Sequence, residues 1–238
     1  MRKILSTAAA LLAGAAVTLA GGGTSVAAGA GVIHVPSDFV PALSDTRATG
    51  HYAVQGTGLH VWTEGNTSTD KVAEYVATST PLAGAGEPSL SYTPTSGTTP
   101  PGFQLVVDFD GNGSPDGILV GEPVYNGDWW ASNGSAQFVK DGAPSHTGGS
   151  GSTNHGTLDQ WRAAFPNANV LAFGFSLGSG VLGDGVINSM TFAGTTYTFA
   201  ADVVLTSKDQ CKNGGWATST MPVYKNQGEC VSHFASGK

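Results

Sequence analysis

Residues 105–120 read LVVDFDGNGSPDGILV, in which two short apolar runs flank a loop of Asp, Asn, Ser and Gly. Runs of Leu, Val and Ile this short suit buried β-strands and fall below the usual length of a helix. Turn residues between two such runs predict a strand, a loop and a second strand. Because no helical periodicity flanks the loop, the stretch indicates an all-β fold.

The same alternation recurs along most of the chain, where Gly, Pro, Asn and Asp punctuate runs rich in β-branched and aromatic residues. We expect strands at residues 32–35, 51–54, 59–62, 72–78, 89–92, 105–109, 118–120, 136–139, 170–175, 187–192 and 195–205. Their spacing has no fixed period, which argues against a propeller or a solenoid. The fold we expect is an antiparallel β-sandwich of jelly-roll or concanavalin-like type.

Two stretches are typical of long surface loops, residues 81–102 and residues 141–156, both rich in Gly and Ser or Pro. One short helix is expected after Thr157, because Thr157 and Gln160 fit a capping box. Apolar residues then follow at helical spacing, and we expect Trp161 among them to lie in the core.

The first thirty residues are typical of a secretory signal peptide. Two basic residues precede an apolar run over residues 4–20, and cleavage sites of small residues end at Ala28 or Ala30. The alternative is a membrane anchor, but the run is rich in Ala, Gly and Thr, whereas a spanning helix needs about 20 strongly apolar residues. We therefore expect a secreted chain with no membrane partner after cleavage.

The chain is acidic, with ten Lys or Arg against seventeen Asp or Glu. Two of the basic residues, Arg2 and Lys3, belong to the predicted signal peptide, so residues 31–238 carry a formal charge of −9. An acidic chain without a cluster of Lys and Arg is a poor partner for phosphate backbones or anionic membranes. We expect a monomer that does not bind nucleic acid.

Oxygen-bearing side chains recur at every second position of the central loop, at Asp108, Asp110, Asn112, Ser114 and Asp116. With Gly113 at its sixth position, the loop matches the first half of the calcium-loop pattern D-x-[DN]-x-[DN]-G. It departs from an EF-hand because Leu119 occupies the place of the last, bidentate Glu and no helices flank it. It resembles instead the strand-flanked aspartate loops of FG-GAP and related β-protein repeats.

This loop predicts a structural calcium site, with Glu122 as a further possible ligand. The alternative is a hairpin turn without an ion, in which Asp and Asn side chains only cap the backbone.

A second candidate site lies in the run YNGDWW, residues 125–130. Neighbouring residues of a strand point to opposite faces, so at most one of Trp129 and Trp130 is buried. An aromatic ring beside short polar groups suits a sugar, whose faces are apolar and whose edges form hydrogen bonds. The candidate ligand-binding residues are Tyr125, Asp128, Trp129 and Trp130. The alternative is that the second Trp packs beneath the loops.

Sequence patterns that look catalytic are weak. Residues 174–178 read GFSLG, but the glycine-rich residues after them do not continue as the helix that a hydrolase elbow requires. Residues 178–183 formally match a dinucleotide-binding pattern and are more typical of a glycine-rich turn. A pair of carboxylates for glycoside hydrolysis depends on distances that only the fold sets. No catalytic residue is assigned.

Cys211 and Cys230 are the two cysteines of the chain, and in an exported protein they predict a disulfide. Closing a loop of this length stabilises the folded state by about 3 kcal/mol in the chain-entropy model. We expect a sandwich over residues 31–205 and a disulfide-closed tail over residues 206–238.

The tail motifs CKNGGW, residues 211–216, and NQGECVS, residues 226–232, resemble a tail found on many exported actinobacterial proteins of uncharacterised function. Residues 108–199 are also similar to the body of one such family. The resemblance implies export and a disulfide, and it implies no reaction.

The sequence favours a secreted, non-enzymatic module that binds glycan or other cell-surface material. The alternatives are a secreted hydrolase, more plausibly glycan-cleaving than a serine esterase, and an extracellular structural or envelope protein.

Overall fold

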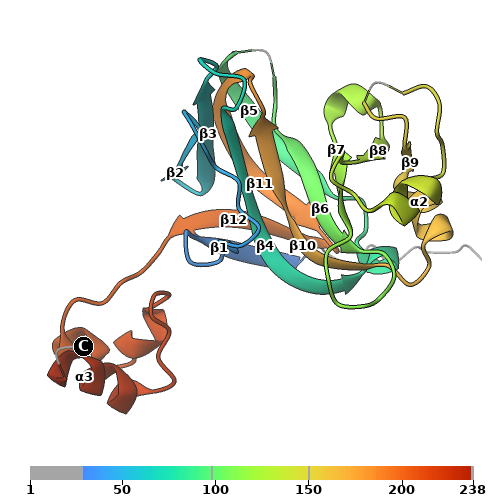
Figure 1. Cartoon of the computed structure of the whole chain (residues 1–238). Helices are drawn as coiled ribbons and strands as arrows, with labels where there is room; N and C mark the ends of the chain where they lie inside the picture. Colours follow the sequence, from blue (N-terminus) through green and yellow to red (C-terminus); the bar gives the residue numbers. More distant parts are fainter. Residues whose placement is uncertain (1–28, 98, 150, 237–238) are drawn as a thin grey trace, which may run out of the picture.

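The structure is a computed structural model and describes residues 29–97, 99–149 and 151–236, so all but the last two residues of the predicted signal peptide lie outside it. The described residues form two β-sheets and a small C-terminal unit (Figure 1). The predicted all-β fold with two largely antiparallel sheets is confirmed.

The first sheet has the strand order β1–β12–β11–β3–β2, and β5 pairs with the other edge of β11. Its pairs are antiparallel except β1 with β12, which is parallel. Its strands are β1 (Gly29–Val35), β2 (His51–Gln55), β3 (Gly58–Glu64), β5 (Ser89–Gly97), β11 (Leu182–Phe192) and β12 (Thr195–Ala201).

The second sheet is antiparallel throughout, with the order β4–β10–β6–β7–β8–β9. Its strands are β4 (Lys71–Pro81), β6 (Gly102–Asp108), β7 (Gly117–Gly121), β8 (Asp128–Ala131), β9 (His155–Thr157) and β10 (Asn169–Gly178).

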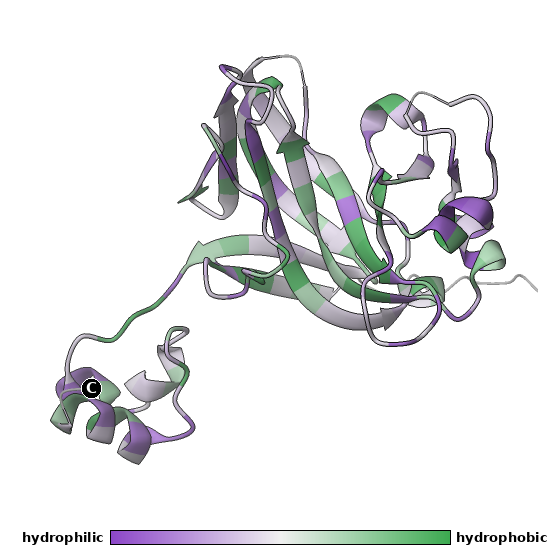
Figure 2. Ribbon diagram, in the orientation of Figure 1, coloured by the Kyte–Doolittle hydropathy of each residue, from purple (hydrophilic) through white to green (hydrophobic). Residues whose placement is uncertain are grey.

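The apolar faces of the two sheets share one core, as the hydrophobic residues on the strands of both sheets in Figure 2 suggest. Leu59, Ile187 and Phe199 of the first sheet are buried together with Leu105 and Phe173 of the second. Burying each such side chain stabilises the fold by about 1.5–3 kcal/mol. Phe103 at the start of β6 and Trp129 at the start of β8 belong to this core, and Leu90 of β5 packs against it. These three strand starts line the candidate site described below.

Three α-helices occur among the described residues: α1 (Gln137–Asp141), α2 (Leu158–Ala164) and α3 (Gln227–Ala235). The predicted helix is α2, and its capping box is confirmed. The Gln160 amide donates to Thr157 Oγ1 (3.3 Å), and the Thr157 amide donates to Gln160 Oε1 (2.9 Å). Trp161 is fully buried, as expected, and its Nε1 donates to the Trp129 carbonyl (2.8 Å).

The expectation of a single helix and of a strand at 136–139 was wrong. Residues 137–141 form α1, in which the Val139 and Lys140 amides both donate to the Ala136 carbonyl. Only Val139 of α1 is buried, so a short apolar pair was mistaken for a strand. The expected loop at 81–102 also differs, because β5 pairs along nearly its whole length with β11.

The GFSLG pattern lies inside β10, where Ser176 is buried opposite Ala73 of β4 and Gly102 of β6. The glycine-rich residues after it form the turn from β10 of the second sheet to β11 of the first. A serine in the middle of a paired strand is not the exposed nucleophile of a hydrolase elbow.

The C-terminal tail follows an extended segment after β12 and stands apart from the sandwich (Figure 1). Its short 3-10 helices (Lys208–Cys211 and Gly215–Thr218) precede α3. The predicted Cys211–Cys230 disulfide is formed. Two further 3-10 helices (Leu82–Gly84 and Pro123–Tyr125) lie in the sandwich. None of the helices in the described ranges is long and apolar enough to span a membrane.

Candidate functional site

Strand β8 separates the two neighbouring tryptophans. Trp129 is 6% exposed and faces the core, whereas Trp130 is half-buried on the opposite face. The prediction that at most one of them is buried is confirmed. The candidate residues therefore divide, and Tyr125, Asp128 and Trp130 meet in one hollow without the Trp129 ring.

This Trp130 hollow has a volume of about 290 Å³. The Tyr125 ring meets the Trp130 ring edge-on, with centroids 5.9 Å apart and planes at 86°. The Trp130 Nε1 is buried and has no hydrogen-bond acceptor among the described residues. The hollow is lined by Tyr125, Asn126, Asp128, Trp130, Gly149, Gly151 and His155.

The loop over residues 141–156 covers Trp130 in part. A Cβ atom at Gly151 would lie 3.0 Å from the Trp130 and Tyr125 rings, so a larger residue here would force the rings or the loop to shift by a few tenths of an ångström. The second tryptophan therefore packs partly beneath a glycine-rich loop, as the alternative prediction had it. The part of Trp130 that stays exposed faces the hollow.

His155 completes the hollow and is absent from the predicted site residues. Its Nδ1 lies 2.7 Å from Asp128 Oδ2 and its Nε2 lies 3.1 Å from the Thr147 carbonyl oxygen. The His155 ring thus lies between two acceptor oxygens, one from β8 and one from the loop over residues 141–156. Pairing of β9 with β8 places His155 beside Trp130, and a contact across this many residues follows only from the sheet.

The pKa of Tyr125 is changed by its surroundings. Burial, and then the charge of the Glu122 carboxylate, raise the pKa of Tyr125 to about 12. The phenol therefore stays protonated at neutral pH and can donate a hydrogen bond.

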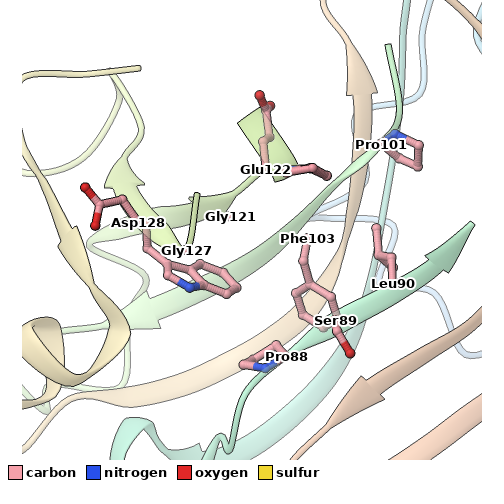
Figure 3. A pocket seen from close by; sticks show the side chains of 11 residues that line it. Pro88, Ser89, Leu90, Pro101, Phe103, Gly121, Glu122, Gly127 and Asp128 are labelled. Atoms are coloured by element: carbon pink, nitrogen blue, oxygen red, sulfur yellow. The ribbon is translucent and has the colours of Figure 1, made fainter. Parts of the chain in front are cut away.

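A second hollow lies on the core side of β8 (Figure 3) and has a volume of about 260 Å³. Phe103 and Trp129 form its buried floor, with centroids 6.2 Å apart. A Cβ atom at Gly121 would lie 2.8 Å from the Trp129 indole, so glycine lets the ring lie against β7. This Phe103 hollow is lined by Pro88, Ser89, Leu90, Pro101, Phe103, Gly121, Glu122, Pro123, Gly127, Asp128 and Trp129.

Two more hollows extend the series, and each shares residues with the next. A Val124 hollow of about 250 Å³ shares Glu122 and Pro123 with the Phe103 hollow. A Tyr92 hollow of about 240 Å³ shares Thr99 and Pro100 with the Val124 hollow. Asp128, the first residue of β8, lines both the Phe103 hollow and the Trp130 hollow, which lie on opposite faces of this strand and meet at its start. We call the four hollows, linked in this way by shared lining residues, the groove. It runs from edge strand β5 of the first sheet to β8 and β9 of the second.

The aspartate loop joins β6 to β7 and brings three of its five predicted ligands together. One carboxylate oxygen of each of Asp108, Asp110 and Asp116 lies within 4.8 Å of the others. Asn112 Oδ1 accepts the Ser114 amide (2.7 Å), so these two residues meet each other and brace the backbone.

Asp108 organises the backbone of this loop. Its Oδ1 accepts the amides of Gly111 (2.8 Å) and Asn112 (3.2 Å), and its Oδ2 accepts the amide of Gly113 (2.8 Å). Burial by itself raises the pKa of Asp108, but these amide hydrogen bonds outweigh it and hold the pKa below its ordinary value. Asp and Asn side chains thus cap backbone amides of the loop, as the alternative to a calcium site predicted. The three carboxylates that could hold an ion are gathered in the same loop.

Glu122 takes no part in this cluster. Asp116 precedes β7 and Glu122 follows it, so about 20 Å of extended strand separates them. The possibility that Glu122 is a late metal ligand was wrong. The groove and the aspartate loop accordingly lie at opposite ends of the β6–β7 pair.

No family model, no curated protein sequence and no solved structure matches the chain. What the protein does is therefore argued from the geometry of the groove and of the aspartate loop.

Proposed function

We propose that the chain is a secreted, non-enzymatic module that binds a glycan chain along the groove. The main support for this proposal is the series of four hollows that share lining residues. An extended polymer needs adjacent subsites of this kind. Export rests on the predicted signal peptide, and the disulfide between Cys211 and Cys230 suits an oxidising compartment.

The Trp130 hollow suits one sugar residue. The indole and the Tyr125 ring offer apolar surface, while Asn126, Asp128 and His155 offer hydrogen-bond partners close by. The Trp130 Nε1 is buried and is not reached from the hollow, so Trp130 offers the ligand apolar ring surface and not its N–H.

Binding fits the arrangement of the carboxylates better than cleavage does. Glu122 and Asp128 line the same Phe103 hollow, which is the observation that favours a glycan-cleaving hydrolase as the second candidate. Figure 3, however, shows the Asp128 carboxylate turned away from Phe103 and Leu90, and His155 holds it by a 2.7 Å contact. The Asp128 carboxylate is therefore engaged by His155 and is not aimed into the Phe103 hollow.

The decisive experiment measures binding of the mature chain to a panel of polysaccharides and their oligosaccharides by pull-down and calorimetry. We expect Trp130→Ala to lower the affinity at least about tenfold, since it removes the apolar face of the hollow. Tyr125→Phe keeps the ring, removes the hydroxyl, and should give a smaller loss.

Trp62→Ala is the matched control, because Trp62 is a half-buried tryptophan of β3 outside the four hollows. Binding that survives Trp130→Ala but not Trp62→Ala contradicts the proposed site. New reducing ends in the same mixtures, lost in Glu122→Gln, establish the hydrolase instead. Absence of any glycan binding leaves the extracellular structural protein as the better account.

We also propose that the aspartate loop binds calcium, in a structural role. Three carboxylates within 4.8 Å repel one another unless a cation offsets their charge, and calcium prefers hard oxygen ligands. Because the loop lies at the far end of the β6–β7 pair from the groove, its ion would stabilise the fold without touching the glycan.

Calcium should therefore raise the thermal midpoint of the metal-free chain, and magnesium should do so much less. Asp110→Asn should abolish this shift, since Asp110 is the exposed member of the three and its loss leaves the buried Asp108 network intact. Asp141→Asn, an exposed carboxylate on α1, is the control. An unchanged midpoint in the wild type contradicts the calcium proposal.

A further inference from the structure

Glu122 is placed unusually for a surface acid. It lines both the Phe103 and the Val124 hollow, so it lies near the middle of the groove. Across the described residues it forms no ion pair with Lys, Arg or His. Figure 3 shows its carboxylate at the rim of the hollow, turned away from Phe103 and Leu90.

Apolar side chains contribute much of the lining of the two hollows that Glu122 shares. They include Leu90 and Pro101 in the Phe103 hollow, and Pro123 and Val124 in the Val124 hollow, with Val124 60% exposed. An ammonium group that pairs with this carboxylate would form a charge-assisted hydrogen bond, which is stronger than a hydrogen bond between neutral groups. The Glu122 side chain packs against the backbone at Gly102, where a Cβ atom would lie 2.5 Å from the Glu122 Cγ, so glycine leaves room for it.

The net charge of the sandwich also favours a cationic ligand. Residues 31–205 contain fifteen Asp or Glu and four Lys or Arg, a formal charge of −11. Residues 206–238 contain two Asp or Glu and four Lys, a formal charge of +2. A groove in the strongly acidic part attracts cations and repels anionic polymers such as uronic-acid glycans.

From this position and this charge we infer that the groove selects glycans that carry free amino groups, with the Glu122 carboxylate pairing with one ammonium. The inference rests on the proposed function, because it names the class of glycan that the groove takes. An ammonium supplies three donors to a carboxylate, and the sugar ring that carries it supplies apolar surface to the prolines and Val124. N-acetylation removes the charge and leaves a neutral amide, so it removes the basis of the selection.

Calorimetry with two matched ligands, a glucosamine oligosaccharide and its fully N-acetylated counterpart, tests the inference on the mature chain. At about pH 6 we expect the amine form to bind at least about tenfold more tightly, and added salt to reduce this preference. Glu122→Gln keeps the shape of the side chain and should reduce amine binding to the level of the acetylated ligand. Glu64→Gln, an exposed acid of β3 away from the groove, should leave the preference unchanged.

The outcomes separate the inference from the function on which it rests. Equal affinity for both ligands, or an amine preference that survives Glu122→Gln, overturns the inference and leaves a glycan-binding groove in place. Tight binding of an oligolysine peptide with no binding of either sugar overturns both. Loss of amine binding in Trp130→Ala as well as in Glu122→Gln supports both, since the two side chains line different hollows of one groove.

Discussion

The sandwich buries many large side chains from two sheets, whereas the buried apolar cluster of the tail consists of Tyr224 and the two cysteines, together with Leu205 of the segment that leads into it. Trp216, Val231 and Phe234 pack against this small cluster and stay partly exposed. A unit this small rarely reaches stability by burial alone and needs a cross-link. The sandwich is therefore stabilised mainly by burial of apolar side chains, and the tail mainly by its disulfide. We expect mutations of core residues to destabilise the first, and loss of the disulfide to destabilise the second.

Trp161→Ala should have the largest effect on the sandwich. Removing a fully buried tryptophan typically lowers the free energy of unfolding by about 3–5 kcal/mol, and here it also leaves the Trp129 carbonyl without its donor. Urea denaturation followed by far-UV circular dichroism measures the loss. Trp216→Ala in the tail is the control and should leave the sandwich transition in place. A wild-type midpoint for Trp161→Ala would contradict the view that this side chain anchors α2 to the core.

Replacing both Cys211 and Cys230 by Ser should destabilise the tail by about 3 kcal/mol. Hydrogen exchange of the α3 amides should rise strongly, while exchange in β6 and β10 should not change. Reduction of the wild-type chain should reproduce the result. A drop of similar size in the stability of the sandwich would break the comparison, because it would show the two regions to be one cooperative unit.

Asp108→Asn should lower the stability of the sandwich by about 2 kcal/mol at neutral pH, in the presence of a chelator, since three amides lose a charged acceptor. The pKa of Asp108 is lowered in the folded state, so its carboxylate contributes fully above the ordinary value of 3.8. The contribution is lost as pH falls through the folded-state pKa, below that value. Wild type and variant should therefore converge on acidification. A gap that widens at low pH would contradict this assignment.

How much of this organisation the sequence predicted differs between the two regions. Strand runs such as 105–109 and 170–175 were found because β-branched and aromatic residues alternate with turn residues. The α2 helix was found because its capping box is a local signal, and the structure forms both of its hydrogen bonds. In the tail, α3 was missed because its polar residues and Gly228 give little helical periodicity, and its packing depends on the disulfide.

The sequence predicted only some of the residues of the candidate site. Tyr125, Asp128 and Trp130 adjoin in sequence, so their shared hollow follows from one strand and one turn. His155 and the separation of Glu122 from the aspartate loop depend on how β7, β8 and β9 pair. Strand alternation predicts that Trp129 and Trp130 part, but it does not say which of them faces the core. The register of the sheet decides that.

The smallest predicted effect comes from two equivalent helix caps, one in each region. Thr157 caps α2 of the sandwich, and Asn226 caps α3 of the tail, where its Oδ1 accepts the Glu229 amide (2.9 Å). Thr157→Ala and Asn226→Ala should each cost about 1 kcal/mol, because each leaves one amide without its side-chain acceptor.

The same loss of energy should nevertheless be measured differently in the two regions. In the sandwich it is a small part of a large cooperative total, so Thr157→Ala should shift the unfolding midpoint slightly, and Thr157→Ser should restore it. In the tail few other contacts hold α3, so Asn226→Ala should raise local hydrogen exchange in α3 about fivefold while the sandwich midpoint stays fixed. If Asn226→Ala instead lowers the global midpoint as much as Thr157→Ala does, the tail draws its stability from the sandwich and the division into two regions is wrong.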